Sequence, residues 1–133
     1  MQSTQQQKGF SIVEVLIVLV ILTILVAALT PAYRNYQIRS NRSDAIKSIL
    51  AIQIAEEKYR ITNMSYGDLA AVWPGTTNSY NNYYQMSITN NTASAYTITA
   101  TALSAQADDT GCTTMTLTNT NGTTTKSPSN CWQ

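Results

Sequence analysis

One carboxylate, Glu14, stands inside an apolar run that begins at Phe10 and continues to Leu29. An ionised side chain within a membrane-length apolar helix costs about 3 kcal/mol or more unless it finds a partner. Cleavage between Gly9 and Phe10 would create the nearest cation, because the new α-amine of Phe10 is protonated near neutral pH. Glu14 could then meet the amine of its own chain, one helical turn away, or that of a neighbouring chain. We favour the intermolecular pair, which would fix the axial register between two packed helices.

Two cysteines, Cys112 and Cys131, lie nineteen positions apart near the C-terminus. If this part of the chain is exported, it reaches an oxidising compartment, where a disulfide is the expected state. Closing a loop of this length would stabilise the fold by about 3 kcal/mol, mostly by restricting the unfolded chain. The alternative is a pair of buried free thiols.

The rest of the chain offers few groups for catalysis or metal binding. It has no histidine, no glycine-rich phosphate loop and no cluster of metal-ligating side chains, so we expect no enzyme, no cofactor and no bound metal. The adjacent acids Asp108 and Asp109 are expected to lie in a solvated loop. The alternative is a cation held by their carboxylates together with loop carbonyls.

The apolar run of residues 10–29 has the length and composition of a membrane-spanning helix. About 20 residues, at roughly 1.5 Å each, cross the hydrocarbon core of a bilayer. Lys8 and the amino terminus place positive charge before the run, which keeps residues 1–9 in the cytoplasm and sends the rest across. A secretory signal cut near Ala28, or a plain signal anchor, would share these features. Neither explains the carboxylate inside the run or the glycine that precedes it.

The boundary of the run reads Lys8-Gly9-Phe10-Ser11-Ile12-Val13-Glu14-Val15-Leu16-Ile17. This segment resembles the class III signal of type IV prepilins. In that family a prepilin peptidase cleaves after the glycine and methylates the new N-terminal phenylalanine, and the glutamate at the fifth mature position serves filament assembly. The resemblance therefore implies cleavage after Gly9, N-methylation of Phe10 and an assembly role for Glu14. Pro31 stands at the twenty-second mature position, where many type IV pilins also have a proline.

The helix that carries the run is expected to continue well beyond it. Pro31 removes a backbone donor and crowds the preceding turn, so a helix kink is expected there. The residues from Ser40 to Ser43 form a weak point where the helix could break, and the helix should end near Asn63, before the glycines and proline that follow. An apolar stripe at helical spacing is formed by Ile38, Ala45, Ile49, Ile52 and Tyr59.

Apolar and polar residues alternate with a period of two after the helix, which predicts three or four strands. The resulting sheet is too small to be stable alone and should pack against the apolar stripe of the helix. The predicted fold class is α+β, the type IV pilin fold: a long N-terminal helix packed on a small antiparallel β-sheet. The strands are expected at residues 84–88, 95–103 and 112–118, with turns at Asn90-Asn91 and Asn121-Gly122.

Three parts are expected along the chain. Residues 1–9 form a prepilin leader peptide, residues 10–30 the transmembrane and assembly half of the helix, and residues 31–133 a periplasmic or extracellular head that includes the amphipathic half of the helix. The loop bounded by Cys112 and Cys131 resembles the D-region of type IV pilins, most closely that of minor pilins of the PilE class.

The resemblance implies a minor pilin that waits in the bacterial inner membrane as a single-pass protein and then packs against other pilin subunits in a cell-surface pilus. Such a subunit supports pilus biogenesis, adhesion, twitching motility or DNA uptake. The alternatives are a type II secretion pseudopilin or the major pilin and, from another class, a membrane-tethered periplasmic binding module.

Direct binding of nucleic acid is the less favoured role. The net charge is only +1, and the chain from Ser65 onward contains three acidic residues and one basic residue, Lys126. Most basic residues fall between Arg34 and Arg60, on a helix that neighbouring subunits would cover in a filament. The tyrosines are expected in the core and on the sheet rather than stacked on bases.

Overall fold

The computed structural model describes residues 9–133, which form two compact units, one up to Tyr36 and the other Gln37–Gln133. The predicted leader peptide therefore lies outside the described residues, except for Gly9. The longest element, α1 (Ile12–Asn63), begins in the first unit and ends in the second.

The first unit is the apolar part of α1. Its best 18-residue window has a mean hydropathy of 3.2 with no buried residue, so the helix is long and apolar enough to cross a membrane. Two hydroxyls within it are satisfied by the helix itself: Thr23 donates to the carbonyl of Val20, and Thr30 to that of Val26, both at 2.7 Å. Pro31 lies inside α1, which continues through it. The predicted kink at Pro31 stays a prediction.

In the second unit α1 is unbroken between Ser40 and Ser43, so the break considered there is wrong. Arg42 in this stretch and Asp44 just after it are tied to the rest of the head, as described below, and those contacts outweigh the weak helix propensity of serine and asparagine. The helix ends at Asn63, as predicted. Met64 takes a positive φ of 57°, which stops the helical path, while its N–H still bonds the carbonyl of Arg60.

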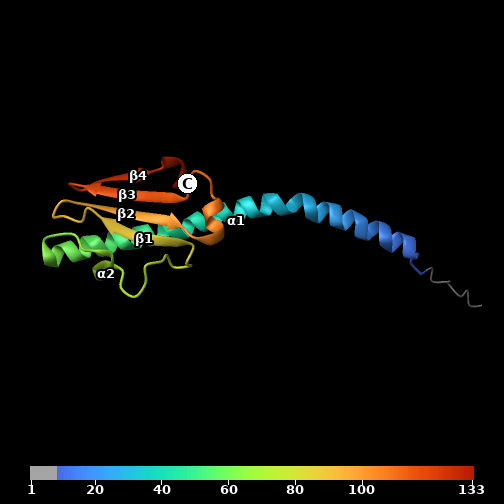
Figure 1. Ribbon diagram of the computed structural model, residues 1–133, viewed down its shortest axis with the longest axis horizontal. Coiled ribbons are helices and arrows are strands. Elements are labelled where there is room, and N and C mark those ends of the chain that lie inside the picture. The colour runs from blue at the N-terminus through green and yellow to red at the C-terminus, as the bar shows by residue number, and fades with distance from the viewer. Residues whose placement is uncertain (1–8) are drawn as a thin grey trace, which may run out of the picture. The chain divides into compact units, whose positions relative to one another are not determined.

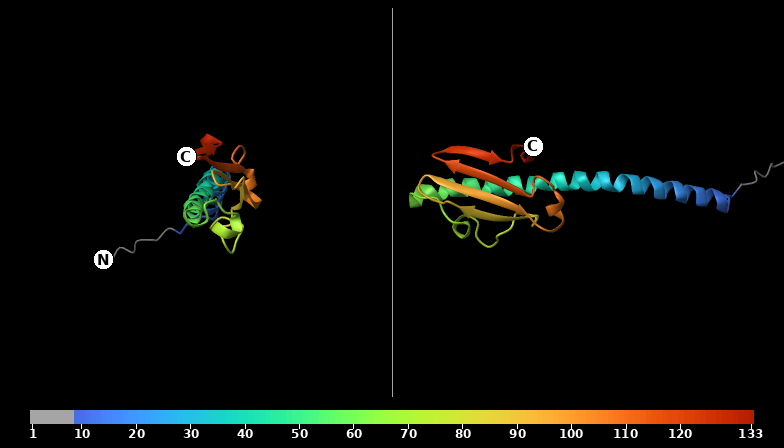
Figure 2. Two further views of the ribbon diagram at one scale, coloured as in Figure 1. Left: turned by 90° about the vertical axis from the view of Figure 1, so that its left-hand side faces the viewer. Right: turned by 45° about the horizontal axis from the view of Figure 1, so that its top comes forward.

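Four antiparallel strands follow in simple neighbour order, so each pairs with the next along the chain. They lie along the second half of α1 in two different views (Figures 1 and 2). The α+β class with a long N-terminal helix and a small antiparallel sheet is confirmed. The strands are β1 (Tyr84–Thr89), β2 (Ala95–Ala102), β3 (Thr114–Thr120) and β4 (Thr123–Ser127), and the short helices are α2 (Leu69–Val72), η1 (Ser104–Asp108) and η2 (Ser129–Cys131).

The core lies between α1 and one face of this sheet. The alternating residues on that face are buried, and they pack on the three central members of the predicted helix stripe. Burying a large apolar side chain of this kind stabilises a fold by about 1.5–3 kcal/mol. The members of this core include Ala45, Ile49, Ile52, Tyr84, Met86, Tyr96, Ile98, Ala100, Met115 and Leu117.

The two edges of the sheet differ. At one edge, β1 is covered by the preceding loop: Thr77 accepts from the N–H of Met86, and Ser79 donates to the carbonyl of Tyr84. At the other edge, all five residues of β4 are exposed. The turn into β4 is the predicted one, because Asn121 and Gly122 have φ values of 53° and 82°, as a two-residue hairpin requires.

Candidate functional site

The predicted cleavage site lies at the start of α1. Gly9, Phe10 and Ser11 precede the helix and are exposed, so the peptide bond between Gly9 and Phe10 is outside regular secondary structure. Among residues 9–133, a Cβ added to Gly9 would meet nothing within 4 Å, so no contact in this part of the chain requires glycine there.

Glu14 lies in the first turn of α1, where a carboxylate interacts favourably with the positive end of the helix dipole. Ser11 and Glu14 have the spacing of a capping box, which gives Glu14 a second, purely local reason to be acidic. The side chains of Phe10 and Glu14 line one shallow groove with Val15, Val18 and Leu19. The structure thus places the carboxylate on the same face as Phe10, surrounded by apolar groups.

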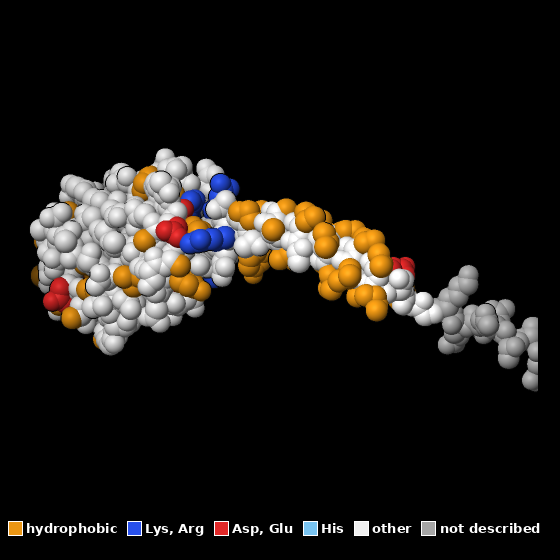
Figure 3. Space-filling view, turned by 45° about the vertical axis from the view of Figure 1, so that its right-hand side comes forward, with side chains coloured by type: hydrophobic (Ala, Val, Ile, Leu, Met, Phe, Trp, Pro, Cys, Tyr) orange, Lys and Arg blue, Asp and Glu red, His pale blue; other side chains and the backbone are white. Residues whose placement is uncertain are grey.

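The helix surface beyond Glu14 is apolar on every side. Figure 3 shows hydrophobic side chains along this part of the chain, with acidic atoms at its beginning. Phe10 is 84% exposed, and the large residues that follow are at least half exposed or nearly so. A helix that is apolar all round is stable only inside a membrane or among other chains.

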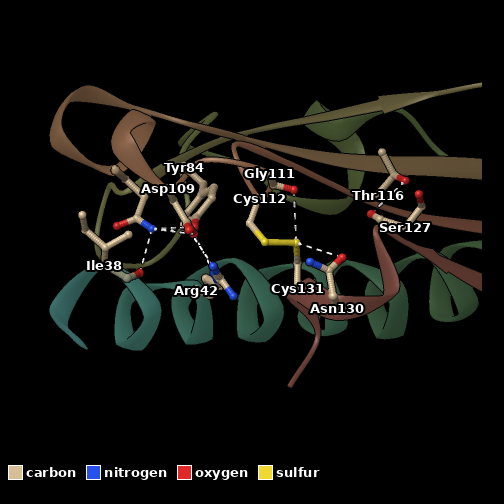
Figure 4. The surroundings of a disulfide bond; sticks show 11 residues. Ile38, Arg42, Tyr84, Asp109, Gly111, Cys112, Thr116, Ser127, Asn130 and Cys131 are labelled. Atoms are coloured by element: carbon tan, nitrogen blue, oxygen red, sulfur yellow. Dashed lines mark hydrogen bonds and ion pairs between the residues drawn. A yellow bond between two sulfur atoms is a disulfide. The ribbon is translucent and has the colours of Figure 1, made fainter. Parts of the chain in front are cut away.

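The head is closed by the predicted disulfide. Cys112 and Cys131 are bonded, with their Cα atoms 5.7 Å apart, and both are buried. The bond joins the residues before β3 to η2, as Figure 4 shows. The alternative of two free thiols is excluded in the structure.

A buried ion pair lies beside the disulfide region. Arg42 on α1 donates from Nε and Nη2 to the two carboxylate oxygens of Asp109, both at 2.6 Å (Figure 4). The Arg42 side chain is 16% exposed and that of Asp109 is 5% exposed. The hydrogen bonds to Asp109 raise the pKa of Arg42 above its ordinary value, so the guanidinium stays charged. The expectation of a solvated loop is therefore wrong for Asp109, whose carboxylate is buried and pairs with the guanidinium of Arg42.

Gln106, on η1, extends this contact. Its Nε2 donates to the carbonyl of Ile38 and to the hydroxyl of Tyr84, each at 2.9 Å. Burial raises the pKa of Tyr84 to about 12, so its hydroxyl stays protonated over the physiological range. Together with the ion pair, these bonds fix η1 against α1 and the first strand.

Two further polar side chains on the buried face of α1 hold the loop before β1. Asp44 accepts from the hydroxyl of Ser79 and from the N–H of Asn81, and Ser48 accepts from the N–H of Tyr80. The buried hydroxyl of Ser79 and the two backbone N–H groups that follow it thus find acceptors on α1, which fixes the loop against the helix.

A third buried acid is only half satisfied. Oε2 of Glu56 accepts from the N–H of Gly67 at 2.8 Å, while Oε1 is buried and has no hydrogen-bond partner. Burial raises the pKa of Glu56, which the bond from Gly67 only partly offsets. Gly67 has no room for a side chain, since a Cβ there would lie 3.0 Å from Cγ1 of Val72 and 3.2 Å from Cδ1 of Tyr59.

The tyrosines divide between the core and the surface. Tyr66, Tyr84 and Tyr96 are buried, as expected, whereas Tyr80 is 62% exposed and packs edge-on against Trp73. Lys126 of β4 lies over the ring of Trp132, 4.9 Å from its centre. Within residues 9–133, no group of three or more His, Cys, Asp or Glu side chains could hold a metal ion.

Three important residues of the head escaped the sequence analysis: Arg42, Asp44 and Glu56. Each is a charged residue on an otherwise apolar helix face. Their positions relative to the apolar stripe could have indicated that they are buried. Asp44 precedes Ala45 directly, and Glu56 follows Ile52 by one turn, so both fall beside the predicted stripe.

The comparisons with known proteins agree with this geometry. The family described as "Type IV minor pilin ComP, DNA uptake sequence receptor" matches residues 31–116, more than half of the chain. The "Prokaryotic N-terminal methylation motif" matches residues 4–30, which include Gly9, Phe10 and Glu14.

Individual relatives match about half of the chain. Fimbrial protein EcpC of Eikenella corrodens is 39% identical over 70 residues, 53% of this chain and 41% of that protein. A fimbrial protein of Neisseria meningitidis serogroup B is 36% identical over 73 residues, 55% of this chain and 39% of that protein. Type II secretion system core protein G of Escherichia coli K12 is 27% identical over 66 residues, 50% and 46% respectively. The chain thus spans less than half the length of these relatives.

Proposed function

Because the chain belongs to the type IV minor pilin ComP family, we propose that it is a structural subunit of a type IV pilus, polymerised through α1 after cleavage behind Gly9. One observation carries the proposal: a single carboxylate, Glu14, lies in the first turn of an exposed apolar helix, beside Phe10 and the exposed peptide bond that precedes it. The match of residues 4–30 to the methylation motif supports processing at this bond.

The pair of charges, one on Phe10 and one on Glu14, gives the packed helices a specificity that apolar contacts alone do not give. Lipid shields the apolar surface of α1 as well as neighbouring helices do, so burial alone gives little reason to leave the membrane. An amine on Phe10 and the carboxylate of Glu14 of a neighbouring chain attract each other strongly once helix packing encloses them in apolar surroundings, where either would be costly alone. The pair therefore favours one axial register in the polymer over the other registers.

The head contributes the surface of the fibre. The Arg42–Asp109 pair fixes the loop after η1 to α1, and the disulfide fixes η2 to the residues before β3. The proposed path begins in the inner membrane, passes the prepilin peptidase and ends among other pilin subunits at the cell surface.

Mass spectrometry of the chain recovered from sheared surface filaments tests this function. We expect a mature chain that begins with N-methylated Phe10. The variant Gly9→Val should remain uncleaved, while Ser11→Ala, two residues away, should be processed normally. Because a side chain at Gly9 would meet nothing among residues 9–133, a processing defect would report on the peptidase rather than on the folding of the head. A native chain that retains its leader, or that begins near Ala28, would contradict the proposal and favour a tethered periplasmic module or a secreted protein.

The ratio of subunits in the fibre distinguishes the related assemblies. A minor pilin should be much less abundant in purified filaments than the main subunit. Equal abundance would favour the major pilin, and absence from pili together with a secretion defect would favour a type II pseudopilin, as for the core protein G relatives.

A second function, binding of duplex DNA by the head, is favoured by the family description, which names a DNA uptake sequence receptor. Arg42 is tied to Asp109 and Arg60 to Tyr66, so the exposed lysines Lys47, Lys58 and Lys126 are the better candidates for phosphate contacts. Each phosphate contact should contribute about 0.9 to the slope of log affinity against log salt. Retention of duplex DNA that weakens with salt and with Lys126→Ala would support this function, and no retention at low salt would exclude it.

A further inference from the structure

Two exposed tyrosines and an arginine follow the apolar run within one turn of α1. Tyr33 is 68% exposed and Tyr36 is 72% exposed, and Arg34 lies between them in the sequence. We call these three residues the interfacial collar. Tyrosine prefers the boundary between hydrocarbon and headgroups, where its ring lies in apolar surroundings and its hydroxyl in polar ones, and arginine binds lipid phosphates.

We propose that the interfacial collar binds the headgroup level of the outer leaflet of the inner membrane and thereby sets the depth of α1, so that Glu14 lies at the opposite boundary of the hydrocarbon and not inside it. The inference rests on the membrane stage of the proposed function. The partner is a bilayer surface of lipid phosphates and ester carbonyls.

The length of the helix supports this placement. Tyr33 lies nineteen positions after Glu14, which corresponds to about 28 Å of helix. The hydrocarbon core of a bilayer is about 30 Å thick. A tyrosine at one boundary therefore places the carboxylate at the other.

The residues just before the collar tolerate hydrocarbon. The hydroxyl of Thr30 donates to the carbonyl of Val26 at 2.7 Å, so it needs no water. Pro31 has no N–H to satisfy, and Ala32 is apolar. The membrane segment can therefore extend past Leu29 as far as the collar.

The competing placement centres the bilayer on the most apolar stretch, residues 10–29. Its midpoint lies at Leu19 and Val20, which puts Glu14 about 7 Å inside the hydrocarbon. The midpoint between Glu14 and Tyr33 lies instead at Thr23 and Ile24. The two placements differ by about four residues, or about 6 Å of depth.

The direction of the side chains favours the collar placement. In a helix the Cα–Cβ bond tilts toward the N-terminus, so the carboxylate of Glu14 points out of the membrane on the cytoplasmic side. The rings of Tyr33 and Tyr36 tilt toward the hydrocarbon and cover the turn before them. Each group then lies in the medium that it prefers.

Depth profiling of the full-length chain in vesicles of phosphatidylethanolamine and phosphatidylglycerol tests the inference. Single cysteines introduced one at a time from Ile17 to Val26 would carry a nitroxide, and Cys112 and Cys131 are protected by their disulfide. Collision with oxygen, compared with a polar nickel complex, gives the depth of each label. We expect the deepest label at Thr23 or Ile24.

The double variant Tyr33→Gln/Tyr36→Gln should move the deepest label about four residues toward Leu19, while Tyr80→Gln, on an exposed tyrosine of the head, should not. If the deepest label in the native chain lies at Leu19 or Val20, or if its position is the same in the double variant, the role of the collar is refuted and the pilin function is unaffected. A chain that does not float with the vesicles at all would instead refute the membrane stage itself.

Discussion

Arg42 of α1 and Asp109, just after η1, are 67 positions apart in the sequence and are joined by two hydrogen bonds of 2.6 Å. Both side chains are almost shielded from water, and the guanidinium has the planar geometry that carboxylates match. The pair connects the start of the head's helix to the loop that leads into the disulfide.

Removal of one member of this pair should destabilise the head strongly. Arg42→Ala leaves the carboxylate of Asp109 buried without its cation, so we expect a loss of about 3 kcal/mol in the free energy of unfolding. Lys47→Ala, an exposed cation on the same helix, should change stability by less than about 0.5 kcal/mol. Urea unfolding of the full chain in detergent measures both, and equal losses in the two variants would contradict the structural role.

The disulfide should contribute a similar amount to the stability of the head. Replacing Cys112 and Cys131 by serine removes a cross-link over a sequence separation of 19. The unfolded chain gains freedom, and the expected cost is about 3 kcal/mol. Thermal unfolding with and without reductant checks this: reductant should lower the midpoint of the native chain to that of the double serine variant, and should leave the variant unchanged.

Glu56 predicts a specific dependence of stability on pH. Its pKa is raised in the folded head, mainly by burial, above the ordinary value of 4.5. A raised folded pKa means that the neutral acid is favoured by folding, so its contribution is complete below pH 4.5 and is lost as the pH rises through the folded value. In Glu56→Gln this loss should disappear, so the variant should gain stability relative to the native chain toward neutral pH. Parallel unfolding profiles from acid to neutral pH would show that Glu56 does not titrate in this way.

Glu14→Ala separates processing from assembly. The variant keeps Gly9 and Phe10, so we expect cleavage close to that of the native chain. Without the carboxylate, the amine of a neighbouring subunit has no partner, and entry into pili should fall at least about tenfold, which corresponds to about 1.4 kcal/mol. Immunoblots of sheared filaments and of membranes measure the two steps separately, with Thr23→Ala as a matched control. Normal incorporation of Glu14→Ala would remove the docking role and leave helix capping as the reason for the acid.

Local sequence patterns predicted most of the fold. The alternation of Tyr84 and Met86 with polar neighbours placed the first strand and its buried face correctly, because strand periodicity is a property of adjacent residues. The end of the helix at Asn63 and the turn at Asn121-Gly122 were also predicted, since both depend on residues that favour positive φ or interrupt helices.

Local sequence patterns did not predict the polar contacts between residues far apart in the sequence. Asp109 was expected in solvent because nothing in its neighbourhood shows that Arg42 will lie opposite it. Ser40 to Ser43 looked like a weak point because helix propensity ignores the tertiary bonds made by Arg42 and Asp44. Charged residues on an apolar helix face were the missed signal, and their partners become visible only in the folded head.

The unequal edges of the sheet limit how heads can join to one another. Backbone groups at Tyr84 and Met86 are already occupied by Thr77 and Ser79, whereas the five exposed residues of β4 offer an unshared border. If two heads paired through their β4 edge strands, each would lose its free edge, and a third head would have no edge strand to pair with. Pairing of sheet edges between heads would therefore stop at two heads, so continuation of the sheet does not explain a longer fibre, whereas contacts between the apolar helices have no such limit.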